Sequence, residues 1–344
     1  MRKANLLSIL VAGISAIGVS SCKNGDADFS NYDNSAVYFA YQTPVRTLVM
    51  GEDTYPTELD NAHKCKIYAT MGGAYGGSGS TVIDIMVDES LCENLYFEDG
   101  TTPVKVMPSN YYTLASEQIT LNENNNLMGG VEVQFIDAFF NDEASLTNSY
   151  VIPIRMTDVV NADSILVGIP KTDNVSWTNS VMWDTAPRNY VLYCVKYINK
   201  WDAEYLRRGI DKVTEGGTTV TNVRHEEYVE DDEICSVTTR NLDTAVFPVS
   251  TTVGTTTLTC DLLLTFNDKD ECTITSGTDG YMASGTGKFV EDGEKNSWGN
   301  KDRNALYLEY NIDFGMKQYQ TKDTLVVQTR GVSFETFSPV YKEN

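Results

Sequence analysis

The sequence predicts an all-β protein of two domains, a β-sandwich followed by an antiparallel β-barrel. Its 344 residues exceed the usual size of a single domain. Short stretches of alternating apolar and polar residues follow one another with Gly, Asn and Asp between them, and no stretch before Arg188 shows a helical period. Short strands at steady spacing are typical of a sandwich, and a closed barrel would hide the strand edges of the second half.

Residues 189–209 join the two domains. Every second residue from 191 to 197 is β-branched or aromatic, and the alternation restarts at Trp201 after a polar pair at 199–200. We therefore expect the last strand of the first domain to run almost directly into the first strand of the second. The expected boundaries are 35–199 for the sandwich and 200–344 for the barrel.

The beginning of the chain has the pattern of a bacterial export signal. Two basic residues precede an apolar segment at 6–19, which is too short to span a membrane. The following Val-Ser-Ser-Cys resembles a lipobox that ends at Cys22, although its first and third residues depart from the usual ones. We expect residues 1–21 to be a signal peptide, Cys22 to be lipidated and residues 22–34 to form a flexible tether. A simple secreted protein is the alternative.

The strands of the first domain are separated by turn-forming residues. A Gly-rich run at 72–80 is not followed by Lys-Ser/Thr or by a helix, so it predicts a hairpin loop rather than a phosphate-binding loop. Pro153 lies inside the last strand before the junction loop, which predicts an edge position for that strand. The strands are expected at residues 36–41, 45–50, 65–71, 81–87, 101–107, 130–137 and 150–157.

Four short runs in this half carry a family resemblance. Tyr-Thr-Leu, Ile-Thr-Leu, Gly-Gly-Val-Glu-Val-Gln-Phe and Tyr-Val-Ile-Pro-Ile-Arg-Met-Thr follow one another between residues 112 and 157. This order resembles the N-terminal immunoglobulin-like domain of Bacteroidetes surface lipoproteins, an adhesin-like domain of unknown function. The resemblance covers about residues 30–198. It implies an outer-membrane location facing the cell exterior, which the acidic residues after Cys22 also favour, and an association with glycan-import loci.

The second domain shows a longer alternating pattern. Keeping Cys272 and Ile274 on the face of Leu264 and Phe266 requires a loop with an odd number of residues, plausible at 267–271. The opening run Trp-Asp-Ala-Glu-Tyr-Leu-Arg-Arg-Gly resembles the start of a lipocalin-like C-terminal domain found behind the adhesin-like domain, which implies a lipocalin-like barrel. The strands are expected at 220–229, 234–239, 244–249, 255–266, 272–274, 281–290, 304–314 and 323–332.

Composition argues against several functions. A net charge of −22 repels nucleic acid and anionic lipid, so we expect no nucleic-acid partner and membrane contact only through the lipid anchor. The two histidines form no HExxH motif, no cysteines are spaced as CxxC, and the Asp-x-x-Asp-x-Asp-x-Glu run of related endo-glycosidases is missing from the sequence. We expect no catalytic residues, metal site or cofactor. One or two disulfides, a structural calcium held by acidic oxygens, and a hydrolase with a cryptic site stay open as alternatives.

A loop just before the junction is the first candidate glycan site. Two indoles with amide and carboxylate neighbours can stack on sugar C–H groups and pair with hydroxyls. The alternative is that these indoles pack the interface between the domains. The candidate residues are Trp177, Trp183, Asn179 and Asp184.

A long polar loop at 291–303 provides the second candidate site. Its aromatic and polar side chains could hold a glycan at the rim of the barrel. The alternative is that its indole plugs one end of the barrel. The candidate residues are Tyr281, Trp298, Asn300 and Arg303.

The features above predict a non-catalytic, lipid-anchored cell-surface protein of a polysaccharide or glycoprotein-glycan utilisation system. Such a protein would hold oligosaccharide for uptake by aromatic stacking. The resemblance implies an outer-membrane transporter complex of the same locus as its protein partner. The alternative is an adhesin or structural surface lipoprotein that has a protein partner and binds no glycan.

Overall fold

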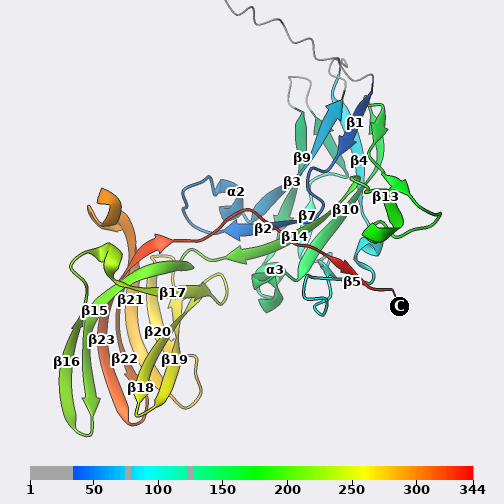
Figure 1. Cartoon of the computed structure of the whole chain (residues 1–344). Helices are drawn as coiled ribbons and strands as arrows, with labels where there is room; N and C mark the ends of the chain where they lie inside the picture. Colours follow the sequence, from blue (N-terminus) through cyan, green and yellow to red (C-terminus); the bar gives the residue numbers. More distant parts are fainter. Residues whose placement is uncertain (1–33, 74–78, 122–126, 344) are drawn as a thin grey trace, which may run out of the picture.

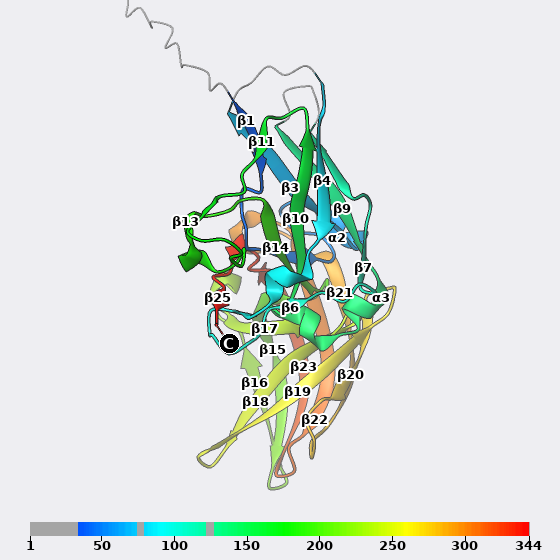
Figure 2. The same ribbon diagram turned by 90° about the vertical axis from the view of Figure 1, so that its right-hand side faces the viewer.

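The chain forms a sandwich and a barrel joined by a very short connection (Figure 1). A computed structural model describes residues 34–73, 79–121 and 127–343. The expected signal peptide, lipidation site and tether, and the centre of the Gly-rich loop, lie outside the described residues. Strand β14 (Tyr190–Ile198) belongs to the sandwich and β15 (Ala203–Glu215) to the barrel. Figure 2 shows the barrel below the sandwich, along the same long direction.

The sandwich consists of two sheets packed face to face. Their strands, besides β14, are β1 (Ser35–Tyr38), β2 (Pro44–Val49), β3 (Lys64–Gly73), β4 (Thr81–Val87), β6 (Lys105–Val106), β7 (Tyr112–Leu114), β8 (Gln118–Leu121), β9 (Met128–Phe135), β10 (Tyr150–Val160), β11 (Ser164–Ile165) and β24 (Glu335–Thr336). One sheet has the order β11-β1-β3-β9-β7 and the other β24-β2-β14-β10-β4-β8, with β6 beside β10. Leu48, Ile83, Val133 and Val195 are fully buried between them. The expected immunoglobulin-like sandwich is confirmed.

Short elements complete the sandwich and the barrel. They are the strands β5 (Leu95–Tyr96), β12 (Ile169–Pro170), β13 (Trp183–Thr185) and β25 (Val340–Tyr341), the helices α2 (Glu58–Asn61) and α3 (Asp137–Phe140), and the 3-10 turns η1 (Glu89–Cys92), η2 (Glu143–Leu146), η3 (Ser180–Met182), η4 (Val229–Asp231) and η5 (Trp298–Asn300). No helix in the described part of the chain is both long and apolar enough to cross a membrane.

Strand β10 lies between β14 and β4, so the expectation that Pro153 marks an edge strand is wrong. Pro153 pairs with Leu192 of β14, and its carbonyl accepts a hydrogen bond from the amide of Asp88, just after β4 ends. The nitrogen and carbonyl of one strand residue point to the same side. The donor that proline lacks therefore faces the end of β4, where the regular ladder has already stopped, and its loss costs little.

The second half forms the barrel. Its strands after β15 are β16 (Thr218–Arg224), β17 (Glu233–Thr239), β18 (Thr244–Val253), β19 (Thr256–Phe266), β20 (Glu271–Ser276), β21 (Met282–Glu294), β22 (Arg303–Asp313) and β23 (Lys317–Thr329). All neighbours are antiparallel, and pairing of β15 with β23 closes a barrel of eight strands, β15 and β17–β23, with β16 as an extra strand on β15. The expected barrel is confirmed.

Side chains fill the barrel interior. Tyr205, Phe247, Leu262 and Tyr310 are almost fully buried there. The expected register of the fourth and fifth barrel strands is confirmed, because Leu264 pairs with Ile274 and Phe266 with Cys272, which leaves the five residues 267–271 between the last two. The interior is therefore a packed core, as in small barrels whose lumen is occupied by their own residues.

An ion-pair network crosses one side of this interior. Asp323, fully buried, binds Arg224 at 2.5 Å and Arg207 at 3.0 Å, and accepts a hydrogen bond from Tyr310. Asp211 accepts from Arg224 at 2.6 Å. Burial alone would raise the pKa of Asp211, but its hydrogen bonds from Arg224 and Thr321 bring that pKa below its usual value. Paired charges of this kind hold β16 against the barrel wall.

The six cysteines of the described chain are free thiols. They therefore pack as small apolar side chains, and the disulfides left open by the sequence do not form. Burial raises the pKa of most of them to about 12, which keeps them protonated and unreactive. The thiols raised to about 12 are Cys65, Cys92, Cys194, Cys235 and Cys272.

The chain does not end in the barrel. After β23 it returns to the sandwich, where β24 pairs with β2 and β25 with β5. Residues 335–341 therefore belong structurally to the sandwich, although the expected second domain ran to residue 344. Arg330 marks the crossing: its guanidinium donates to the carbonyls of Met50 at 2.7 Å and Asp202 at 3.1 Å. These bonds tie the sandwich, the connection and the tail together.

Candidate functional site

The two indoles expected in the junction loop stack on each other. Trp177 and Trp183 have ring centroids 5.3 Å apart, and Trp183 is buried with its Nε1 donating to the carbonyl of Ser176 at 3.0 Å. The guanidinium of Arg155 lies 5.7 Å from the ring of Trp177. Asn179 is buried and Asp184 is exposed. Trp177 packs against an apolar cluster of the sandwich itself, and Trp183 is buried, so the two indoles pack mainly against the protein.

The second predicted cluster lies on the barrel. Trp298 is half-buried, its Nε1 donates to the carbonyl of Val327 at 3.1 Å, and the Arg303 guanidinium sits 3.3 Å from the ring centroid. Asn300 is exposed beside it, whereas Tyr281 packs edge-on against Phe314 in the barrel core. Figure 1 shows β13 and the orange β21–β22 connection on opposite sides of the molecule. The two predicted clusters therefore do not form one site.

A groove on the sandwich, not identified from the sequence, lies where the returning tail crosses the first domain. It is bounded by the loop at 97–102, the segment at 146–149 and the tail at 334–337, and encloses about 860 Å³. We call it the tail groove. Among the described residues no cluster of three or more His, Cys, Asp or Glu is placed to hold a metal ion.

Three contacts fix the tail along this groove. Glu335 pairs with Lys196 at 3.0 Å, and Glu98 accepts from the backbone amide of Ser338 at 2.8 Å. Phe337 is buried against Phe97, with ring centroids 5.0 Å apart. Successive side chains of an extended segment point to opposite sides. Because Phe337 points inward, the aromatic residue three positions earlier points outward.

That outward residue is Phe334, which lines the groove with 67% of its surface exposed. Tyr41 lies beside it with 57% exposure, and the two ring centroids are 4.9 Å apart. Large aromatic side chains of folded proteins are usually more buried than these two. A pair of flat rings left open beside a groove is suited to stacking on the C–H faces of a ligand.

Polar groups also line the groove. The Oδ1 of Asn148 is buried and has no hydrogen-bond partner within the described chain. The hydroxyls of Thr147 and Ser149 lie 3.1 Å apart. Hydrogen bonds from Thr102, and then from Thr101, lower the pKa of Asp99 to about 2, so its carboxylate stays ionised at neutral pH. The groove thus combines ring faces with amide, hydroxyl and carboxylate groups.

Sequence reasoning missed Tyr41, Phe334 and Asn148. A weak signal existed for Phe334, because the Phe-Glu-Thr-Phe spacing at 334–337 places its two rings on opposite sides of an extended segment. Nothing in the sequence indicated that this segment would reach Tyr41, since the two residues are almost 300 positions apart.

Two family models match the chain. A domain of unknown function (DUF5627) matches residues 200–331, and a model described as an N-terminal domain matches residues 32–163. A Bacteroides ovatus protein of unknown function, solved by crystallography, is 44% identical; the match covers 91% of this chain and 100% of that one, with a TM-score of 0.86. None of the curated proteins matches this chain.

Two further B. ovatus structures resemble the chain more distantly. One, of unknown function, is 10% identical with a TM-score of 0.40. The other, a candidate carbohydrate binding protein, is 11% identical with a TM-score of 0.29. Each match covers 89% of this chain and 99% of the other. Scores this low carry no argument about function.

Proposed function

The chain belongs to the family of the B. ovatus protein of unknown function, and on that premise we propose that it is a non-catalytic carbohydrate-binding protein that holds oligosaccharide in the tail groove. The observation that carries the proposal is the exposed ring pair of Tyr41 and Phe334 beside a groove that contains the unpartnered Oδ1 of Asn148. Sugars present apolar C–H faces and a surrounding ring of hydroxyls, and the groove offers a partner for each.

The cellular setting is also part of this proposal. Export by the N-terminal signal, lipidation at Cys22 and exposure on the outer membrane are supported by the sequence pattern and by the resemblance to surface lipoproteins. In that setting the protein would capture glycan outside the cell and pass it to an outer-membrane transporter complex of the same locus. A neutral ligand would meet no repulsion from a chain with a net charge of −22.

Affinity electrophoresis against a broad panel of soluble glycans, followed by calorimetry on any that retard the protein, tests this proposal. The variant Tyr41→Ala/Phe334→Ala should weaken binding roughly 10-fold or more, because it removes both stacking faces. Tyr228→Ala is the matched control, since Tyr228 is as exposed as Tyr41 but lies in the barrel domain. Absence of any retained glycan for the wild type, or equal affinity of the double variant and the control, would overturn the proposal.

A further inference from the structure

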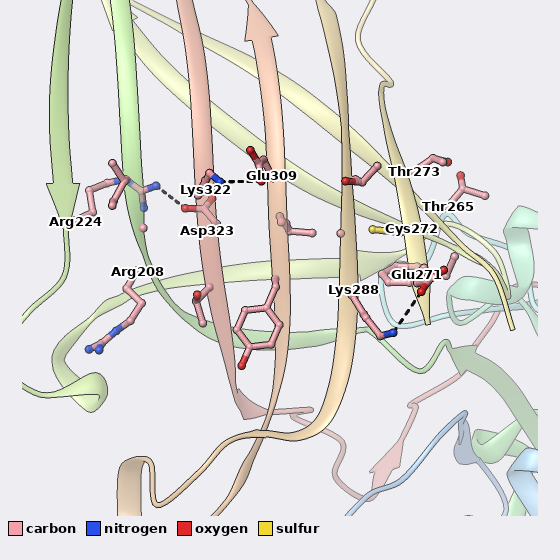
Figure 3. Close-up of a pocket in the computed structure, with 18 of the residues that line it drawn as sticks. Arg208, Arg224, Thr265, Glu271, Cys272, Thr273, Lys288, Glu309, Lys322 and Asp323 are labelled. Carbon is pink, nitrogen blue, oxygen red and sulfur yellow. Dashed lines mark hydrogen bonds and ion pairs between the residues drawn. The ribbon is translucent and has the colours of Figure 1, made fainter. Parts of the chain in front are cut away.

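The outer wall of the barrel carries a second hollow, about 1200 Å³ in volume, formed by β15, β16 and β19–β23 (Figure 3). Its exposed side chains alternate along their strands with core residues. Thr286 precedes Gly287, for example, and Lys322 precedes the fully buried Asp323. Alternate residues of a strand face opposite sides of a sheet, so the hollow lies on the outside of the barrel. We call it the wall hollow.

Two glycines lie in the part of the barrel wall that forms the hollow. Gly209, Asp323, Leu308, Gly287 and Cys272 are register neighbours on successive strands. A Cβ on the first glycine would lie 2.3 Å from the Asp323 carboxylate, and one on the second 2.5 Å from the Leu308 side chain. Only glycine permits so close an approach of backbone and core. The backbone of the wall therefore lies close to the core side chains at this height.

The charges around the hollow neutralise each other. Lys322 pairs with Glu309 at 3.0 Å, and Lys288 with Glu271 at 3.3 Å, as Figure 3 shows. Two further cations line the hollow and are also paired, Arg208 with Asp232 and Arg224 with Asp211 and Asp323. A ligand that enters the hollow therefore meets paired charges and no concentrated charge of one sign. A strongly charged ligand would gain no electrostatic attraction there, and an uncharged polar ligand would not be at a disadvantage.

Hydroxyl groups fill the space between those ion pairs. Thr265, Thr273 and Thr286 form one continuous row across three strands. Each offers a hydroxyl that donates and accepts, next to a methyl group. Tyr307 adds an aromatic ring at the side of this row: it is paired with Lys288 on β21, and its hydroxyl donates to Glu294 at 2.7 Å. That hydrogen bond holds the ring in one orientation.

We propose that the wall hollow is a second carbohydrate-binding site, for an uncharged oligosaccharide that packs on Tyr307 and exchanges hydrogen bonds with the threonine row. It rests on the proposed function only in the class of ligand, because the hollow and the tail groove share no residue. Neutral hydroxyls and a fixed ring match the uncharged hydroxyls and apolar faces of such a ligand.

The experiment uses the full mature chain with the tail groove disabled by Tyr41→Ala/Phe334→Ala. Uncharged hexaoses of glucose, xylose and mannose, and a sulfated glycan for comparison, are titrated by calorimetry and by heteronuclear NMR. Thr286→Arg is added to fill the hollow, and Tyr307→Phe to release the ring while keeping its shape. Thr257→Arg is the control, because Thr257 is exposed on the same outer wall but does not line the hollow.

Saturable binding of an uncharged hexaose that survives in the disabled chain, falls at least 10-fold with Thr286→Arg and is unchanged by Thr257→Arg would support the second site. Loss of all binding in the disabled chain, while the wild type still binds, would overturn it and leave the proposed function intact. Equal affinity and equal stoichiometry for the wild type and the disabled chain, both lost with Thr286→Arg, would leave the wall hollow as the site and overturn the tail groove. Preference for the sulfated glycan would overturn the ligand class.

Discussion

Two aromatic pairs of the sandwich have similar spacing and opposite surroundings. Trp177 and Trp183 stack at 5.3 Å with their faces occupied by each other and by Arg155. Tyr41 and Phe334 lie 4.9 Å apart with more than half of each ring open to water. The difference teaches that residue type alone does not identify a binding platform. A pair close in sequence packed inward, whereas a pair assembled from both ends of the chain faces outward.

Trp183→Ala should have the largest effect on this comparison. Removing a buried indole with a satisfied Nε1 leaves a cavity and should lower the free energy of unfolding by about 3 kcal/mol or more. Urea denaturation followed by far-UV circular dichroism measures it. Glycan affinity of the folded variant should stay unchanged, so a variant of normal stability that no longer binds glycan would reverse the roles of the two pairs.

The exposed pair should behave in the opposite way. Tyr41→Ala/Phe334→Ala removes rings that contribute little to the core, so its free energy of unfolding should stay within about 1 kcal/mol of the wild type. The same denaturation experiment tests this value alongside the glycan titration. A large loss of stability would mean that the rings serve mainly to pack the tail.

A smaller effect is expected from the ion pair that holds the tail. Glu335→Gln removes the partner of Lys196 from a partly exposed pair, which should cost up to about 1 kcal/mol of stability. Glycan affinity should fall a few-fold, because Phe334 precedes this anchor directly. Raising the salt concentration should weaken the wild type towards the variant. Equal glycan affinity of the wild type and Glu335→Gln at low salt would show that the Glu335–Lys196 pair does not contribute to binding.

The smallest effect concerns pH. The pKa of Asp99 is about 2, so this carboxylate contributes in its ionised form at all pH values well above that and would be neutralised only as the pH falls through it. Binding in the tail groove should therefore be constant between about pH 5 and 8. Calorimetric titrations across that interval measure it, and a marked fall within it would implicate a different titrating group.

Strand patterns predicted most of the fold. The alternation around Leu264 and Phe266 set both the register and the turn length of the returning strand, because a shift of one residue would have exposed the core face. The prediction of an edge strand from Pro153 was wrong, because an interior strand tolerates proline at a position where its neighbouring strand has already ended. Such a local end of pairing depends on tertiary structure and leaves no trace in the strand's own residues.

The candidate sites were less predictable than the fold. Trp298 and Arg303 lie together, since four residues of one loop separate them, and the guanidinium covers the indole. The tail groove could not be predicted in this way. It depends on Phe334 crossing back to Tyr41, and the physical cause is long-range pairing of β24 with β2. The wall hollow similarly contains glycines that only the closed barrel brings into one row.

The return of the last strands to the sandwich has a consequence for biogenesis. Synthesis of the chain begins with the sandwich, yet the β2 edge of that sandwich stays unpaired until β24 follows the barrel. Premature termination just beyond the barrel would release a molecule with an uncapped β2 edge, prone to pair with other chains. The sandwich can therefore be completed only after the barrel and the returning strands have been made.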